Sequence, residues 1–224
     1  HSRAMNNVVA GERVVDFGSG EGDLARALTE KGCRVTGMDR KTPGKQNKDV
    51  FEKFIRQDLN RPMSKSLFAG MDKLLMLDVI EHLASPERFV DRLREDPSLS
   101  VNTELLVSTG NVGFFIVRLG LLAGMFNYGK RGILDLTHTR LYTFTTIRRL
   151  LEQSGFEVLE TSGVPAPFPL ALGRGWLARV LLMLNRMAIR IWPSLFAYQI
   201  FLQAQKCPTL RDLLDDVQKQ PQNH

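Results

Sequence analysis

The residues best suited to chemistry near the start of the chain form a glycine-rich turn. Residues 13–17 (Arg-Val-Val-Asp-Phe) are mostly apolar and predict a buried strand. The end of this strand and the turn after it contain Asp16, Gly18, Ser19, Gly20 and Gly22. Glycine adopts positive φ and lets a ligand approach the backbone closely. A dinucleotide-binding turn would have its third glycine where this chain has Asp23, so the turn favours a smaller, nucleotide-like ligand. Glycine turns after strands also arise for steric reasons alone.

Three aspartates each follow a predicted strand. They are Asp39 after residues 34–38, Asp58 after residues 54–57 and Asp78 after residues 73–77. In an open α/β sheet, ligands bind beyond the carboxyl ends of the strands. There Asp39 can accept hydrogen bonds from both hydroxyls of a ribose, and Asp58 can accept one from an adenine amino group, with Leu59 beside the base. One such aspartate is usually a turn residue, but the ordered set indicates an adenosine site.

Strands and helices alternate along the first half of the chain. A fifth strand is predicted at 104–108, and helices are predicted at 22–31 and 86–94. This alternation is typical of parallel βαβ units and predicts a doubly wound α/β sheet. The elements predicted after it are an inserted apolar helix at about 112–125, a helix at 145–153, a strand at 156–160, a basic apolar helix at 174–191 and a final edge strand at 196–203.

The composition is that of an ordinary globular protein. The chain has 224 residues, 43% of them hydrophobic and 24% charged, which is enough for one large domain that needs no disulfides. Cys33 and Cys207 are too few for a disulfide framework or a zinc knuckle, so a reducing, cytoplasmic location is expected. The sequence contains no run of 18 uncharged apolar residues, which is about the length needed to cross a bilayer. We expect residues 1–10 to be a tag remnant or linker, 11–206 to form one domain and 207–224 to be a polar tail.

One long segment of this chain, whose net charge is +6, lacks acidic residues. There is no Asp or Glu from Thr161 to Leu210. The same segment carries Arg174, Arg179, Arg186, Arg190 and Lys206. The basic apolar helix at 174–191 can lie on the inner face of an anionic membrane, wall a pocket for a lipid-like acceptor, or pack across a homodimer. These alternatives stay open. Nucleic acid is disfavoured, because the basic residues alternate with aliphatic rather than aromatic side chains.

From about residue 11 to residue 206, the sequence resembles the class I S-adenosylmethionine-dependent methyltransferases. Residues 14–22 match that family's glycine-rich motif, with Ser19 where many members have cysteine or alanine. Asp39 matches its ribose-binding residue. Residues 77–83 (Leu-Asp-Val-Ile-Glu-His-Leu) match the fourth-strand motif of its ubiquinone-biosynthesis-like subgroup. Residues 128–143 resemble the Asp-x-Thr-His segment of bacterial, often uncharacterised, methyltransferases.

The resemblance implies a fold, a cofactor and a set of cofactor-binding residues. The fold is a Rossmann-like seven-stranded, mostly parallel sheet flanked by helices, with an antiparallel last strand. The cofactor is S-adenosyl-L-methionine. Its expected binding residues are Asp16, Gly18, Ser19, Gly20, Gly22, Asp39, Arg40, Asp58, Leu59, Asp78 and Val79. Members of the family usually have helices ahead of the first strand, which this sequence does not predict.

His138 is the residue that we expect to act as a general base. A neutral imidazole there can take the proton from an attacking hydroxyl or amine, although the same side chain could simply hold its loop in place. A metal set is the alternative: Asp78, Glu81, His82 and His138 resemble the metal-binding segment of plant small-RNA 2′-O-methyltransferases. Asp78 is one methylene shorter than the glutamate of that segment, so we expect no metal; Mg²⁺ is the ion that such a set would take.

The resemblance implies methyl transfer to an oxygen or a nitrogen, with oxygen favoured. The acceptor would be a small molecule, a glycan or a lipid-linked compound, and residues 112–142 and 164–192 would lie on its side of the site. A non-catalytic, cofactor-binding scaffold domain of a larger membrane-associated or sugar-transferring polypeptide is the alternative. An NAD-dependent reductase is disfavoured by Asp23 and by the lack of a Tyr-x-x-x-Lys pair near a strand end.

Overall fold

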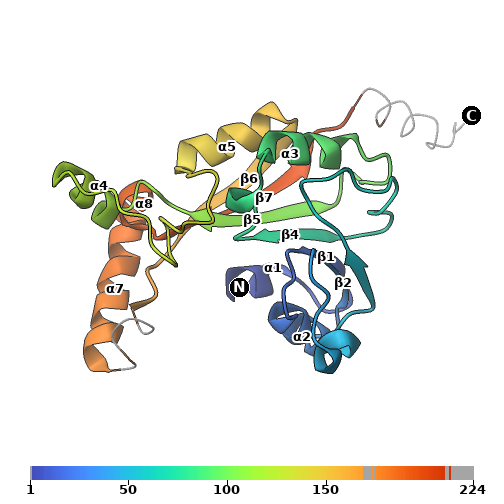
Figure 1. Ribbon diagram of the computed structural model, residues 1–224, viewed down its shortest axis with the longest axis horizontal. Helices are drawn as coiled ribbons and strands as arrows, with labels where there is room; N and C mark the ends of the chain where they lie inside the picture. Colours follow the sequence, from blue (N-terminus) through green and yellow to red (C-terminus); the bar gives the residue numbers. More distant parts are fainter. Residues whose placement is uncertain (1, 169–172, 174, 210–211, 213–224) are drawn as a thin grey trace, which may run out of the picture.

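A seven-stranded sheet forms the centre of the computed structural model, which describes residues 2–168, 173, 175–209 and 212 (Figure 1). The strand order is β3-β2-β1-β4-β5-β7-β6. The strands are β1 (Arg13–Phe17), β2 (Arg34–Asp39), β3 (Lys53–Arg56), β4 (Lys73–Leu77), β5 (Glu104–Gly110), β6 (Phe156–Val164) and β7 (Gln199–Lys206). Strands β1 to β5 pair in parallel, and β7 pairs antiparallel with both β5 and β6. The predicted Rossmann-like, mostly parallel sheet is confirmed.

Helices cover both faces of the sheet, because its central strands are apolar on both sides. In β4, Leu74 and Met76 pack in the core shared with α3 and α5, whereas Leu75 packs in the core shared with α1 and α2. Strands buried on both faces are typical of parallel sheets with two helical layers. The helices are α1 (Ser2–Asn7), α2 (Asp23–Glu30), α3 (Pro86–Glu95) and α5 (Phe144–Gln153), and Figure 1 shows the two pairs on opposite sides of the sheet.

The last strand, β7, lies inside the sheet. We predicted an edge strand at 196–203, and this prediction is wrong in both position and bounds. Residues Pro193–Phe196 form the short helix α8, and β7 inserts between β5 and β6. Its apolar residues explain the interior place, because Ile200, Phe201 and Leu202 are consecutive and all buried. Consecutive buried residues point to both faces of a sheet, which an interior strand between two helical layers requires.

The segment before the first strand packs on the sheet. Where a tag remnant or linker was expected, residues Ser2–Asn7 form α1. Ala4 in this helix and Val8 just after it are both buried, in one apolar cluster with Leu28 and Val35. Residues 2–8 therefore belong to the packed domain, and a helix precedes the first strand.

Three further helices extend beyond one end of the sheet, at the left of Figure 1. They are α4 (Phe115–Leu122), α7 (Trp176–Ile191) and α8. The inserted helix α4 is shorter than predicted, since Gly124 adopts a φ of +71° just after it. Arg174, the predicted start of the basic helix, lies outside the described residues, as does most of the predicted polar tail. No helix in the described part of the chain is long and apolar enough to span a membrane.

Candidate functional site

The glycine turn after β1 is held against the end of β2 and leaves open space above it. The backbone N–H of Gly18 donates to the carbonyl of Met38 at 2.7 Å, and Gly18 has a φ of +67°. A Cβ at Gly18 would lie 2.7 Å from Cγ2 of Val79, so only glycine fits there. At Gly20, where φ is +53°, a Cβ would meet no atom within 4 Å. The turn therefore offers a bare backbone surface to a ligand.

Asp39 ties this turn to the end of β2. Its Oδ2 accepts a hydrogen bond from the N–H of Gly20 at 3.0 Å, and its Oδ1 accepts one from the N–H of Lys41 at 2.9 Å. An ionised carboxylate has about four acceptor positions. Two of them are thus left for a ligand, which is the number that the two hydroxyls of a ribose would use.

A cleft of about 520 Å³ opens at the carboxyl ends of the first four strands. The predicted residues that line it are Gly18, Asp39, Arg40, Asp58, Leu59, Asp78 and Val79. It is also lined by Gln57, Asn60, His82, Leu83 and Thr137. Four of these five were not predicted, because they lie in loops whose course depends on the tertiary fold; His82 was predicted only as a metal ligand.

The remaining predicted cofactor residues lie behind or beside the cleft. Asp16 is buried in β1, and its pKa is raised to about 7 by burial and by the negative charge of Asp39. The buried hydroxyl Oγ of Ser19 has no hydrogen-bond partner in the described part of the chain. Gly22 stands at the N-cap of α2, where a Cβ would lie 2.9 Å from the ring of Phe51. Close packing is therefore sufficient to explain a glycine at position 22.

A second cavity, of about 290 Å³, adjoins the cleft and shares Asp78 and His82 with it. His138 lines this cavity, as the sequence led us to expect. Its Nδ1 lies 2.9 Å from the carbonyl oxygen of Ile133, so Nδ1 carries the proton and donates it to that carbonyl. Nε2 then keeps its lone pair and can accept a proton. The rings of His138 and His82 are edge to face, with centroids 4.7 Å apart.

Glu81 also lines the second cavity and is a candidate base that sequence reasoning missed. It is 2% exposed, and its Oε2 makes no hydrogen bond within the described part of the chain. Burial, together with the charge of Asp78, raises the pKa of this carboxyl group to about 7. A carboxyl group with this pKa exchanges protons near neutral pH. From the sequence, Glu81 was considered only as a possible metal ligand beside His82.

Asp78 connects the two cavities. Its backbone is in the left-handed region, with a φ of +56°. Its carboxylate accepts hydrogen bonds from Oγ of Ser108 at 3.1 Å and from Nε2 of Gln199 at 2.9 Å. A non-glycine residue in this conformation is strained and is often found at functional sites. Gln199 belongs to β7, so the interior position of that strand helps to fix Asp78.

The four residues weighed as a metal set do not form a metal centre. In the described part of the chain, no three His, Cys, Asp or Glu side chains are placed to hold one ion. His82 instead directs Nδ1 at the carbonyl oxygen of Thr137, 3.2 Å away, and His138 uses its own Nδ1 on the carbonyl of Ile133. Both contacts use Nδ1 and fix the ring orientations of the two histidines.

Comparison with known sequences agrees with this geometry. Residues 2–161 match the model of a family described as methyltransferase domain. The ubiquinone biosynthesis O-methyltransferase of Nitrobacter winogradskyi is 27% identical over 164 residues. That match covers 70% of this chain and 61% of the relative, so the chain spans about three fifths of the relative's length.

Solved structures share the fold at low sequence identity. One is the 1,6-didemethyltoxoflavin-N1-methyltransferase of Burkholderia thailandensis, solved with bound 1,6-didemethyltoxoflavin and S-adenosylhomocysteine. Its TM-score is 0.56 at 14% sequence identity, and the match covers 92% of this chain and 75% of that one. Another is the magnesium protoporphyrin IX methyltransferase of Synechocystis PCC 6803 with bound S-adenosylhomocysteine. Its TM-score is 0.56 at 19% sequence identity, and the match covers 91% of this chain and 78% of that one.

Proposed function

Because the chain belongs to the methyltransferase-domain family of class I S-adenosylmethionine-dependent methyltransferases, we propose that it transfers a methyl group to an oxygen or nitrogen atom of an acceptor. The observation that carries this proposal is the pair of adjoining cavities. One has the glycine turn and Asp39, the other has His138 and Glu81, and the two meet at Asp78 and His82.

The cleft suits S-adenosylmethionine in three respects. The space at Gly20 is open, and the carboxylate of Asp39 has two acceptor positions left. Within the described residues, the buried Oγ of Ser19 has no hydrogen-bond partner. Asp58 and Leu59 line the same cleft and are suited to the adenine end. When bound, this cofactor supplies a methyl group that its sulfonium has already activated. The protein therefore has to align the acceptor and take its proton.

In the second cavity, the residues that suit proton removal are His138 and Glu81. The hydrogen bond from Nδ1 to Ile133 selects the tautomer in which the neutral His138 ring has its lone pair on Nε2, so we assign the base to His138. Glu81 is the second candidate, because its raised pKa lets it bind a proton near neutrality. We favour an oxygen as the acceptor atom, which is supported by the relative named an O-methyltransferase. The acceptor itself can be a small molecule, a glycan or a lipid-linked compound.

Two successive measurements test this function. Calorimetric titration with S-adenosylmethionine and with NAD comes first, and we expect binding of the former alone. Release of S-adenosylhomocysteine is then measured over a panel of phenols, sugars and extracted lipids. Turnover with one class identifies the acceptor. Cofactor binding without turnover on any of them would instead support the non-catalytic scaffold, and binding of NAD would contradict the assignment of the cleft.

We expect Gly20→Ala to weaken cofactor binding while the protein stays folded. A Cβ at this position meets no protein atom within 4 Å, so the fold can accommodate it at the cost of about 1–2 kcal/mol for the left-handed backbone. The methyl group would occupy the space that the cofactor needs, and we expect calorimetry to show affinity reduced at least roughly tenfold.

Gly11→Ala is the matched control for this prediction. Gly11 has a φ of +90°, and its Cβ would also meet nothing within 4 Å, but Gly11 lies before β1, whereas Gly20 belongs to the turn that is hydrogen-bonded to Asp39 at the cleft. The control variant carries the same kind of strain and should keep its affinity. Equal loss of affinity in both variants would show that backbone strain, rather than occupied space, is responsible.

We expect Glu81→Gln to stabilise the protein at pH 8 but not at pH 5. The folded-state pKa of about 7 lies above the ordinary value of 4.5, so the folded state binds this proton more tightly than the unfolded state. Stability therefore falls as the pH rises from about 4.5 to 7, by roughly 2–3 kcal/mol for this group. Glutamine carries no charge and removes this loss.

Urea unfolding at the two pH values measures the effect. Glu95→Gln is the control, because Glu95 is exposed on α3 and has no ion-pair partner in the described part of the chain. If Glu81→Gln has the same effect at pH 5 and pH 8, the carboxyl group is not held protonated by burial.

A further inference from the structure

Helix α7 turns an apolar surface outward. Its fully buried residues are Ala178 and Asn185, whereas the side chains that it exposes include seven large apolar ones. These are Trp176, Leu177, Val180, Met183, Leu184, Met187 and Ile191. At about 100° per residue they fall within one stripe roughly 120° wide, opposite the buried residues. A helix that packs on a sheet normally has polar residues there.

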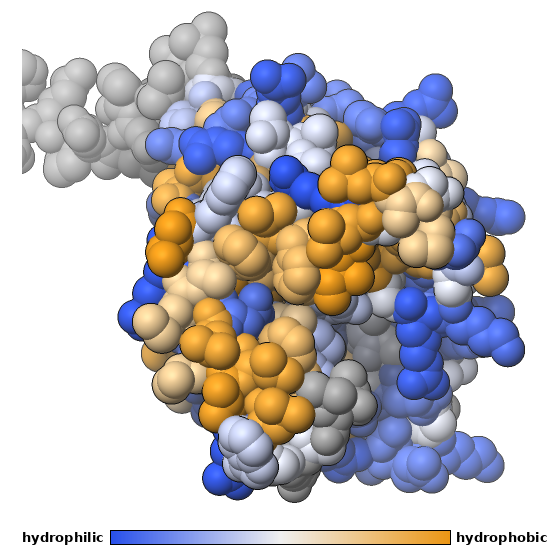
Figure 2. Space-filling model, turned by 90° about the vertical axis from the view of Figure 1, so that its left-hand side faces the viewer, coloured by the Kyte–Doolittle hydropathy of each residue, from blue (hydrophilic) through white to orange (hydrophobic). Residues whose placement is uncertain are grey.

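Helix α4 continues this surface. It and the residues after it expose Ile116, Leu119, Leu121, Leu122, Met125 and Phe126. Figure 2 shows orange, apolar side chains gathered across the end of the molecule where α4 and α7 lie. We call these side chains, those of the α7 stripe and Trp192 the α4–α7 apolar surface. Monomeric proteins rarely expose contiguous apolar patches larger than a few hundred Å² without a binding function.

The two segments that carry this surface have charges of one sign only. Neither 110–134 nor 161–210 contains an Asp or a Glu. On α7, Arg179, Arg186 and Arg190 form a stripe directly beside the apolar one. None of these three forms an ion pair in the described part of the chain. The α4–α7 apolar surface is thus bordered by cations that no carboxylate of the same surface neutralises.

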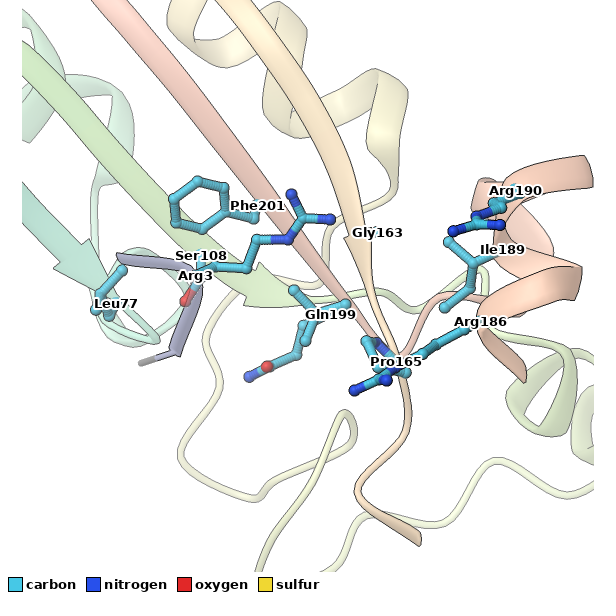
Figure 3. Close-up of a pocket in the computed structure, with 11 residues that line it drawn as sticks. Arg3, Leu77, Ser108, Gly163, Pro165, Arg186, Ile189, Arg190, Gln199 and Phe201 are labelled. Carbon is cyan, nitrogen blue, oxygen red and sulfur yellow. The ribbon is translucent and has the colours of Figure 1, made fainter. Parts of the chain in front are cut away.

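Two of the arginines also face a cavity of about 460 Å³ beside α7. In Figure 3, Arg186 and Arg190 approach it from α7, and Arg3 approaches it from α1 on the other side of β6. Among the described residues no carboxylate lines the cavity, and Arg3 forms an ion pair with Glu160 outside it at 3.6 Å. The other polar side chains of the lining are Ser108 and Gln199. Guanidinium groups bind phosphate through paired, charge-assisted hydrogen bonds. The cavity therefore suits the phosphate of a group bound next to the apolar surface.

We propose that the α4–α7 apolar surface lies in the interface of an anionic lipid bilayer, with Arg186 and Arg190 on lipid phosphate groups. A helix with an apolar stripe beside a cationic stripe is typical of this binding mode. Trp176 and Trp192 stand at the two ends of α7, and tryptophan is enriched at the level of the head groups. A second copy of the chain fits less well, because this surface has no acidic side chain to pair with the partner's arginines.

The test is co-sedimentation with vesicles of phosphatidylcholine, with and without phosphatidylglycerol. We expect binding to the anionic vesicles only, weakened by high salt. Arg186→Gln/Arg190→Gln should bind about 30-fold more weakly, at the usual contribution of each basic residue near an anionic surface. Arg88→Gln/Arg149→Gln removes the same charge from exposed positions on α3 and α5, and it should bind as the wild type does.

A second pair of variants tests the apolar contact. Leu184→Asp/Ile191→Asp places two carboxylates on exposed positions of the α4–α7 apolar surface and should abolish vesicle binding. Val9→Asp/Leu159→Asp makes the same change at exposed apolar positions elsewhere and should leave it intact. Circular dichroism checks that all variants are folded.

Three results would overturn the proposal. One is that the wild type binds neither kind of vesicle. Another is that Leu184→Asp/Ile191→Asp binds anionic vesicles normally, which would indicate adsorption by charge alone. The third is a wild-type dimer that Leu184→Asp/Ile191→Asp converts to a monomer, because the surface would then be covered by a second copy. None of these measurements depends on methyl transfer.

Discussion

His138→Ala is expected to lower turnover by about 10²–10⁴-fold, the range for loss of a general base, while cofactor affinity stays unchanged. His138 lines the second cavity, its Nδ1 is engaged by the carbonyl of Ile133, and it does not line the cofactor cleft. The measurement is release of S-adenosylhomocysteine with the acceptor found in the panel, together with calorimetry for the cofactor.

His138→Asn separates catalysis from positioning. Its amide nitrogen can still donate to the carbonyl of Ile133 as Nδ1 of histidine does, but it offers no basic nitrogen in place of Nε2. We expect this variant to be as slow as His138→Ala. If it retains wild-type turnover, His138 only holds its loop, and the base would then be Glu81, whose Gln variant should show the large loss instead.

Asp39→Ala is expected to weaken binding of S-adenosylmethionine by about 1–3 kcal/mol, or roughly 5- to 150-fold. Before any ligand binds, the carboxylate of Asp39 already accepts hydrogen bonds from the N–H groups of Gly20 and Lys41 and so holds the glycine turn. Its removal leaves the ribose hydroxyls unpaired and releases the glycine turn, so we expect a value in the upper half of this range. Calorimetry measures it.

Asp23→Ala is the control for this second prediction. Asp23 is an exposed carboxylate that directly follows the glycine turn, at the start of α2, and it does not line the cleft. We expect near-wild-type affinity for it. Wild-type affinity in Asp39→Ala would mean that the end of β2 does not hold the ribose.

The parallel half of the sheet was predictable because its signals are local. Each strand is a short apolar run that ends at a glycine or an aspartate, and parallel strands bring those ends to one edge. That rule correctly placed Gly18, Asp39, Asp58 and Asp78 around one cleft. This rule can be applied without knowing which strand pairs with which.

Three features were not predictable in this way. The position of β7 between β5 and β6 depends on pairings between residues as distant as Glu104 and Gln205, which leave no local signal. The raised pKa of Glu81 comes from burial, which only the assembled fold produces. The outward apolar face of α7 resembles a core-facing stripe in the sequence, because periodicity shows that a helix has an apolar side but not what that side contacts.

The interior position of β7 also bears on how the chain folds during synthesis. Among the strands of the described sheet, β7 is the last to leave the ribosome, yet it alone links β6 to the other five. Until residue 206 has emerged, β5 has an unpaired edge and β6 has no partner strand at all. Contacts of such sequence separation form slowly, and an open apolar edge is prone to aggregation. The nascent chain therefore passes through a stage in which its growing sheet needs protection, and β7 ends that stage in one step.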